Sequence, residues 1–249
     1  MEYNRNTQGS PLAQTLNKDL PIGLDVVADI HKVYPNLGKI KTIFDVGANI
    51  GQTSRHFHQG FSNATIFSFE PIQQTFIQLQ KNTADLTRIR YFNHAFGDKP
   101  ETKTVYVQEE SVMNSLVDEL QDVSRPSERV QVKTIDEFGK EHQIDAIDLL
   151  KTDTEGWELN VIQGASRYLA QKKIKFIYSE VGWLETDKRH TFFSELYSYL
   201  IPKGFRMYAL YDHCHHFYDD HSFGLVFANA LFINSEAINE PINPEWWLS

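Results

Sequence analysis

A short glycine-rich run behind an acidic residue is the first stretch of the chain whose residue types could do chemistry. It reads DVGANIG from Asp45 to Gly51, follows an apolar stretch that predicts a buried strand, and leads into a predicted helix. Gly47 can adopt backbone conformations closed to other residues, and Gly51 permits close packing of the helix on the strand. The run therefore predicts a turn at which a ligand approaches bare backbone.

The spacing of this run and its acid restrict which ligand fits. A dinucleotide-binding turn would read G-x-G-x-x-G, whereas this run reads G-x-N-x-G, with Asn49 in the middle and Asp45 two residues before the first glycine. Asp45 would repel a pyrophosphate but attract a cationic amino group, such as that at the methionine end of S-adenosylmethionine. The alternative is a glycine turn that serves only the fold.

Polar side chains after the next two predicted strands extend this site. Glu70 ends the second strand about twenty residues beyond the glycine turn, a place from which a carboxylate accepts hydrogen bonds from both hydroxyls of a ribose. Pro71 begins the following helix and fixes the chain there. Asn93 and Ala95 end the third strand, where an adenine ring would lie, although a turn at Gly97 without ligand contact explains this stretch equally well.

Acidic residues follow the fourth predicted strand, in the run KTDTEGWE from Lys151 to Glu158. Glu158, and in part Glu155, are explained by the stabilising effect of acids in the first turn of a helix. Asp153 is different, because it stands at the carboxyl end of a central strand, where the reactive end of a bound cofactor should lie.

The elements that must position these residues alternate between strand and helix from Lys41 to Gly204. This alternation predicts one α/β domain over residues 41–249, with a doubly wound parallel sheet and a ligand site at the carboxyl ends of its strands. Residues 1–40 predict an N-terminal helical cap, and residues 98–141 an insertion over one edge of the sheet. Two β-rich runs at the end of the chain, with no helix between them, predict a final antiparallel pair.

The order and spacing of these motifs resemble the FkbM family of methyltransferases from Ile43 to Ala165, and KTDTEGWE is the most distinctive part. The resemblance implies a seven-stranded class I methyltransferase fold of the Rossmann-like type, S-adenosylmethionine as methyl donor, and O-methylation, often of sugar or natural-product hydroxyls. Acids without prolines or an aromatic clamp after the fourth strand also suit a hydroxyl better than an amino group. For cofactor binding the resemblance implies Asp45, Gly47, Asn49, Gly51 and Glu70.

Three residues are candidates for the catalytic base, which the resemblance does not define. Asp153 is the first; Glu180 ends the fifth strand, beside Asp153 in strand order; His213 lies in the histidine-rich run from Asp212 to His221. The four histidines and three acids of that run are consistent with a divalent metal site, with a base, or with a solvated loop. Because they show only local clustering, we predict no metal.

Composition restricts the partners and the compartment. The chain has 24 Lys and Arg against 33 Asp and Glu, and its formal net charge of −9 argues against nucleic acid as a partner. A single cysteine, Cys214, excludes an internal disulfide. The first residues lack the pattern of a signal peptide, and no apolar run is long enough to cross a membrane. We expect a cytoplasmic protein without membrane contact; the sequence defines no oligomeric state.

These features together predict in-line displacement at the sulfonium methyl of S-adenosylmethionine by a hydroxyl oxygen of a small molecule, with Asp153 removing the proton. Two alternatives from other classes stay open. The first is an NAD-dependent oxidoreductase, which the missing G-x-G-x-x-G run disfavours. The second is a non-catalytic S-adenosylmethionine-binding module, which would need no acceptor pocket.

Overall fold

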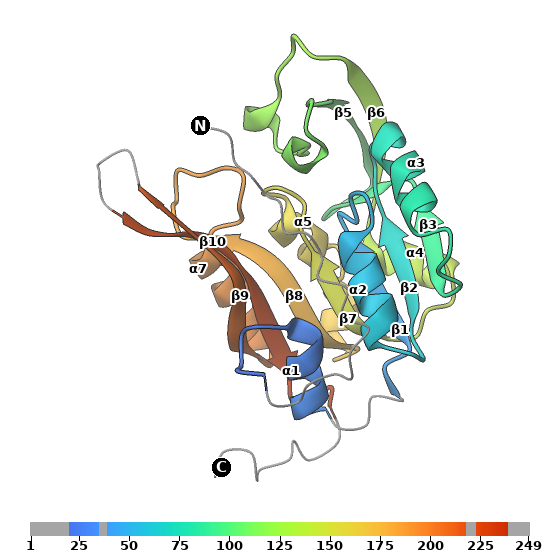
Figure 1. Ribbon diagram of the computed structural model, residues 1–249, viewed down its shortest axis with the longest axis vertical. Helices are drawn as coiled ribbons and strands as arrows, with labels where there is room; N and C mark the ends of the chain where they lie inside the picture. Colours follow the sequence, from blue (N-terminus) through green and yellow to red (C-terminus); the bar gives the residue numbers. More distant parts are fainter. Residues whose placement is uncertain (1–19, 35–38, 218–222, 239–249) are drawn as a thin grey trace.

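The computed structural model of the protein describes residues 20–34, 39–217 and 223–238, and Figure 1 shows how their elements are arranged. A sheet of seven strands forms the centre, in the spatial order β3-β2-β1-β7-β8-β10-β9. Its strands are β1 (Thr42–Val46), β2 (Thr65–Phe69), β3 (Ile89–Phe92), β7 (Ile147–Thr152), β8 (Ile174–Gly182), β9 (Phe205–Phe217) and β10 (Phe223–Asn234).

The strand directions define a switch point in this sheet. The strands β1, β2, β3, β7 and β8 run parallel, and β10 pairs antiparallel with both β8 and β9. The strand order reverses between β1 and β7, which is the place where open α/β sheets bind their ligands. This confirms the predicted doubly wound sheet with a final antiparallel pair.

Helices cover both faces of the sheet. They are α1 (Val26–Val33), α2 (Gln52–Gly60), α3 (Gln73–Asn82), α4 (Ile135–Glu141), α5 (Glu158–Gln163), α6 (Ser166–Ala170) and α7 (Phe193–Leu200), and a 3-10 turn, η4 (Ile201–Lys203), follows α7. None of the helices in the described ranges is long and apolar enough to cross a membrane.

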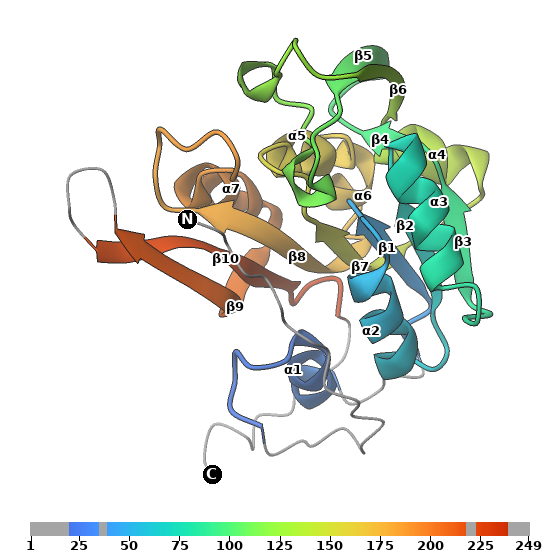
Figure 2. The same cartoon turned by 45° about the horizontal axis from the view of Figure 1, so that its top comes forward.

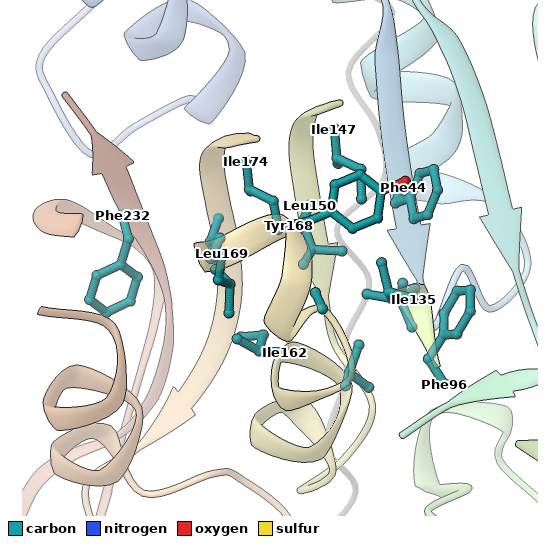
Figure 3. Close-up of a cluster of buried hydrophobic side chains, with 14 of the residues drawn as sticks. Phe44, Phe96, Ile135, Ile147, Leu150, Ile162, Tyr168, Leu169, Ile174 and Phe232 are labelled. Atoms are coloured by element: carbon teal, nitrogen blue, oxygen red, sulfur yellow. The ribbon is translucent and has the colours of Figure 1, made fainter. Parts of the chain in front are cut away.

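Neighbouring residues on each strand belong to different buried clusters, because successive side chains point to opposite faces of a sheet. Ile43 and Leu149 pack with α1 and α2, whereas Phe44 and Leu150 pack with α4 to α7. Figure 3 shows part of the second cluster. The central strand β7 is buried along its whole length, as expected for a parallel strand covered by helices on both faces.

A second, smaller sheet stands above the carboxyl ends of the large one (Figure 2). It has the order β4-β6-β5, with β4 (Ala95–Phe96), β5 (Glu101–Tyr106) and β6 (Ser127–Lys133), and two 3-10 turns, η2 (Ser111–Met113) and η3 (Asp118–Leu120), lie between β5 and β6. The insertion was predicted to lie over one edge of the large sheet, but it lies above the carboxyl ends of the strands (Figure 2). A buried cluster that joins its Val105 and Leu116 to Ile72 and Trp157 packs it over the strand ends instead of over one edge.

Three boundaries also differ from the sequence-based expectation. The predicted third strand is divided, because its first part pairs with β2 and its second part, β4, pairs with β6. The expected histidine-rich loop is largely strand: His215 and His216 pair with Leu225 and Gly224, so backbone pairing outweighs their polar character, while residues 218–221 lie outside the described ranges. The last helix, which the sequence predicts from Arg189 to Gly204, begins only at Phe193, so residues 189–192 lie in a loop before it.

The expected N-terminal cap corresponds to α1 alone among the described residues, and one buried acid ties it to the sheet. Asp29, which is fully buried, accepts hydrogen bonds from the Tyr211 hydroxyl and from the Gly23 amide, both at 2.8 Å. Residues 12–19, where the apolar pattern of the cap begins, lie outside the described ranges.

Candidate active site

A cavity, partly open to solvent, lies at the carboxyl ends of β1, β2 and β7. This is the switch point of the sheet, where open α/β folds bind their ligands. Its wall comes from four stretches: the β1 turn (Val46, Gly47, Asn49), the end of β2 and its continuation (Phe69, Glu70, Pro71, Ile72), the third strand and the small sheet (His94, Ala95, Phe96, Val105, Ser111, Val112, Asn114, Ser115, Leu116), and the β7 turn (Asp153, Thr154, Glu155, Trp157).

The glycine turn after β1 is shaped by a close approach to the β7 turn. Gly47 has a φ of +74°, and a Cβ on it would lie 1.8 Å from the carbonyl oxygen of Asp153. The backbone amide of Gly47 donates to the carbonyl of Phe69 at 3.1 Å. Gly51 has a φ of +99°, and its Cβ would lie 2.7 Å from Thr83. Gly47 therefore serves two purposes, since it lines the cavity and also lets two turns touch.

Asp45, predicted to face the cofactor, lies behind the turn instead of on the cavity wall. It is fully buried, accepts a hydrogen bond from the Ser54 hydroxyl at 2.6 Å and pairs with the Lys151 ammonium at 3.1 Å. The cation that Asp45 contacts in the structure is therefore Lys151, and a contact between Asp45 and the cofactor stays a prediction.

Lys151, which the sequence analysis passed over, holds both turns. Its ammonium donates to the carbonyl oxygen of Gly47 at 2.7 Å and lies 3.7 Å from the Asp153 carboxylate. Burial acts to lower the pKa of Lys151, but the charges of Asp45 and Asp153 outweigh it and raise the pKa overall. The lysine therefore stays charged. Its role could be recognised only from its position between Asp45 and Asp153, and the sequence does not show that position.

Glu70 lies on the cavity wall as the sequence analysis expected. Its two carboxylate oxygens accept hydrogen bonds from the backbone amides of Asn49, at 3.1 Å, and Ile72, at 3.0 Å. Burial raises the pKa of Glu70 to about 7, although both of these hydrogen bonds act in the opposite direction. Asn49 itself has a left-handed φ of 47° and accepts a hydrogen bond from Ser111 at 2.8 Å. One carboxylate thus fixes the turns after β1 and β2.

The predicted adenine region is divided between lining and supporting residues. Ala95 lines the cavity, whereas Asn93 stands behind it and donates to the carbonyl oxygens of Glu70 and Pro71, both at 2.9 Å. His94, between them, was missed and also lines the cavity. Burial, with a smaller effect of Lys133, lowers the pKa of His94 to about 4, so its ring is neutral near pH 7.

Two acids predicted from the ends of neighbouring strands do meet. Asp153 and Glu155 line the cavity, and one carboxylate oxygen from each lies within 4.8 Å of one from Glu180. Glu180 and Glu155 are buried, and Asp153 is half-buried. Because the Lys151 ammonium already supplies positive charge beside Asp153, we assign no metal to this cluster.

Glu158 does more than the helix-dipole explanation implied. It is fully buried, and one of its oxygens accepts hydrogen bonds from the Thr154 amide, the Thr154 hydroxyl and the Gly156 amide, at 2.7, 3.0 and 3.2 Å. The other accepts from the amide and the hydroxyl of Thr191, at 3.2 and 2.7 Å. The acid therefore joins the β7 turn to the segment that follows β8.

His213 is not brought to the other candidates. It lies exposed on β9, with its ring centroid 6.4 Å from that of His215, and it is not among the residues that line the cavity. Strand β9 forms one edge of the sheet, on the far side of β10 from β8. The described histidines that cluster in the sequence around His213 therefore lie along strand β9, away from Asp153, Glu155 and Glu180.

The reversed strand order, the final antiparallel pair and the cavity over the switch point define a class I methyltransferase fold of the Rossmann-like type. The chain belongs to the methyltransferase FkbM domain family, whose model matches residues 45–207. This match confirms the predicted family and S-adenosylmethionine as the cofactor of the fold.

Two individual relatives share less than a third of their aligned residues with this chain. The chain is 29% identical to "2-O-methyltransferase NoeI" of Sinorhizobium fredii (strain NBRC 101917 / NGR234) over 152 residues, which are 55% of this chain and 62% of that protein. It is 25% identical to "Methyltransferase 1" of Beauveria bassiana (strain ARSEF 2860) over 142 residues, 49% of this chain and 57% of that protein. The matches span less than two thirds of either relative.

Among solved structures, the chain resembles a precorrin-6y C5,15-methyltransferase from Geobacter metallireducens GS-15. The TM-score is 0.44 and the identity 11%, over 86% of this chain and 92% of that one.

The Lys151–Asp45 pair gives the first testable prediction. Lys151→Met leaves Asp45 buried without its counter-charge, so the free energy of unfolding measured by urea denaturation should fall by about 3–5 kcal/mol. The exposed helical Lys81 serves as control, since Lys81→Met should change the stability by less than about 0.5 kcal/mol. Adding Asp45→Asn to Lys151→Met should recover part of the loss. A Lys151→Met protein as stable as the wild type would refute this role.

Proposed function

We propose that the protein transfers the methyl group of S-adenosylmethionine to a hydroxyl group of a small molecule, a sugar or a natural product. The observation that carries the proposal is one cavity with two unlike walls. Glu70 and the glycine turn stand on one side, and the acids Asp153 and Glu155, with Glu180 behind them, stand on the other. The printed name of the Sinorhizobium relative, a 2-O-methyltransferase, supports an oxygen acceptor.

The residues of the first wall fit the cofactor. Glu70 offers a buried carboxylate to the ribose hydroxyls, and apolar Phe69, Ile72 and Phe96 with the neutral His94 offer an adenine site of low polarity. Gly47 and Asn49 border the same cavity nearer to Asp153. In this proposal Asp45 and Gly51 support the turn. When bound, the cofactor supplies an activated methyl group on a sulfonium.

The residues of the second wall suit a hydroxyl acceptor. Because the donor is already activated, the protein must mainly align the acceptor oxygen and accept its proton. Asp153 lines the cavity where the β7 turn touches the glycine turn, and its carboxylate lies 3.7 Å from the Lys151 ammonium. One carboxylate oxygen each of Glu155 and Glu180 lies within 4.8 Å of one from Asp153. The formal net charge of −9 supports a small acceptor over a nucleic acid.

The proposal predicts that S-adenosylhomocysteine binds with micromolar affinity or better and raises the melting temperature, because a ligand that binds only the folded state stabilises it. NADH should not change the melting temperature, and this result would argue against the NAD-dependent oxidoreductase alternative. Incubation with a donor labelled in the methyl group and a panel of hydroxylated sugars and natural products should label at least one acceptor. Binding of the donor without any labelled product would favour the non-catalytic module, and stabilisation by NADH alone would remove the proposal.

Glu70 predicts a pH dependence of cofactor affinity. The ribose hydroxyls donate to the ionised carboxylate, but the pKa of about 7 leaves Glu70 largely protonated in more acidic solution. Calorimetry should therefore show the affinity for S-adenosylhomocysteine falling below pH 7, by up to about tenfold per pH unit, and levelling off above it. Glu70→Gln should remove this dependence and weaken binding at pH 8 by roughly 1.5–3 kcal/mol. Glu119→Gln, at an exposed acid, should reproduce the wild-type curve; an unchanged curve for Glu70→Gln would exclude the ribose contact.

Asp153 is predicted to support turnover more than cofactor binding. Asp153→Asn keeps the shape but removes the proton acceptor, so kcat should fall about a hundredfold to ten-thousandfold while the affinity for S-adenosylhomocysteine changes only a few fold. His213→Ala is the comparison, since its exposed position on β9 predicts near-normal turnover. The assignment is wrong if Asp153→Asn stays active and His213→Ala does not.

A further inference from the structure

The segment that joins β8 to α7 (Figure 2) is held tightly against the β7 turn, although it contains no helix or strand. Gly156, with a φ of +98°, lies so close to it that a Cβ would meet the carbonyl oxygen of Lys188 at 2.1 Å. Glu158 accepts two hydrogen bonds from Thr191. The amide of Gly182 donates to the Thr191 carbonyl at 2.9 Å. The segment is therefore positioned by the same KTDTEGWE run that carries Asp153.

His190 is the residue that these contacts position. Its Nδ1 lies 2.6 Å from a carboxylate oxygen of Asp187, and its ring stacks on Phe227, with centroids 4.5 Å apart and an interplanar angle of 12°. A Cβ on Gly182 would lie 2.7 Å from the Cβ of His190, so only glycine leaves room for the ring there. Only 9% of the residue is exposed. The orientation of the imidazole is thus determined on three sides.

The second ring nitrogen faces the acids of the cavity. Nε2 of His190 lies 3.8 Å from an oxygen of Glu180. This distance is too long for a direct hydrogen bond, but one oxygen atom can lie about 2.8 Å from both groups. Glu180 in turn lies within 4.8 Å of Asp153 and Glu155. Asp187, His190, Glu180 and Asp153 therefore follow one another, at 2.6 Å, at 3.8 Å and within 4.8 Å.

Acidic side chains surround His190. Asp187 and Glu180 face it directly, and Glu158, Glu155 and Asp153 lie behind them on the α5 and β7 side. Arg189 is the neighbouring cation, and its guanidinium is directed to the carbonyl of Met113. Burial raises the pKa of Asp187, but hydrogen bonds from His190 and from the Arg189 amide outweigh it and lower the pKa overall. The His190 ring thus lies between two carboxylates, those of Asp187 and Glu180.

We propose that the Asp187–His190 pair receives the proton that leaves the acceptor hydroxyl, with Glu180 between His190 and Asp153. The proposal rests on the proposed methyl transfer. In that step the acceptor oxygen forms a bond to the methyl carbon, the carbon–sulfur bond breaks, and its electron pair stays on sulfur. The hydroxyl proton goes to Asp153, passes by way of Glu180 to Nε2 of His190, and is released to solvent before the next turnover. Asp187 holds Nδ1 protonated, so that Nε2 is the acceptor.

Removal and chemical replacement of the imidazole test the proposal. With an acceptor labelled in the panel of hydroxylated compounds, His190→Ala should lower kcat about a hundredfold or more while KM for the donor stays within about twofold. Added imidazole should restore a measurable part of kcat, and Asp187→Asn should lower kcat without being rescued. The matched control is His56→Ala, because His56 also pairs with an aspartate, Asp25 at 3.2 Å, away from the acids. It should keep wild-type turnover and ignore imidazole.

A second measurement needs no acceptor. In protein labelled with ¹⁵N-histidine and saturated with S-adenosylhomocysteine, His190 should carry a proton on Nδ1, and Glu180→Gln should shift its Nε2 resonance while that of His56 stays in place. Unchanged kcat in His190→Ala, a loss that imidazole does not restore in a protein still stabilised by S-adenosylhomocysteine, or an Nε2 resonance indifferent to Glu180→Gln would each overturn the proposal. If the wild type labels no acceptor, the proposed function fails, and the nitrogen spectrum still decides whether His190 is coupled to Glu180.

Discussion

The ion pair between Lys151 and Asp45 is the interaction on which the site depends. It joins the penultimate residues of β1 and β7, the two strands on either side of the switch point. Two buried charges are costly to remove from water, and they are tolerated here because Ser54 and the Gly47 carbonyl complete their hydrogen bonds. The pair therefore fixes the turn after β1 and the turn after β7 relative to each other before any ligand binds.

The residues of the KTDTEGWE run contact two different parts of the structure. Asp153 and Glu155 face the cavity, whereas Gly156 and Glu158 face the segment after β8. The left-handed backbone at Glu155 and Gly156, with φ of 54° and 98°, makes this division possible within a few residues. A single short stretch after β7 thus places its acids near Glu180 of β8 and also contacts the loop that carries His190. Mutations in it should therefore affect positioning and chemistry together.

The sequence predicted the features that depend on local pattern. Strand and helix periodicity gave the sheet, and the ends of the strands gave Glu70, Asp153 and Glu180, because parallel strands bring their carboxyl ends to one edge. It did not predict partners across the sheet. Asp45 was assigned to a ligand since nothing in the pattern shows that Lys151 neutralises it. His213 was chosen because other histidines lie near it in the sequence. His190 was overlooked because its stretch resembled the start of a helix. The backbone there is held by a hydrogen bond from the Thr191 amide to Glu158, 33 residues away in the sequence.

The contact between Gly47 and the Asp153 backbone has a consequence for divergence among related chains. The two turns are brought together by Lys151 and Gly47 across 104 residues of sequence, with no space for a side chain between them. An insertion or a bulkier residue in one turn is accommodated only by a matching change in the other. The two turns are therefore expected to vary together in related chains, because neither can change its backbone path alone.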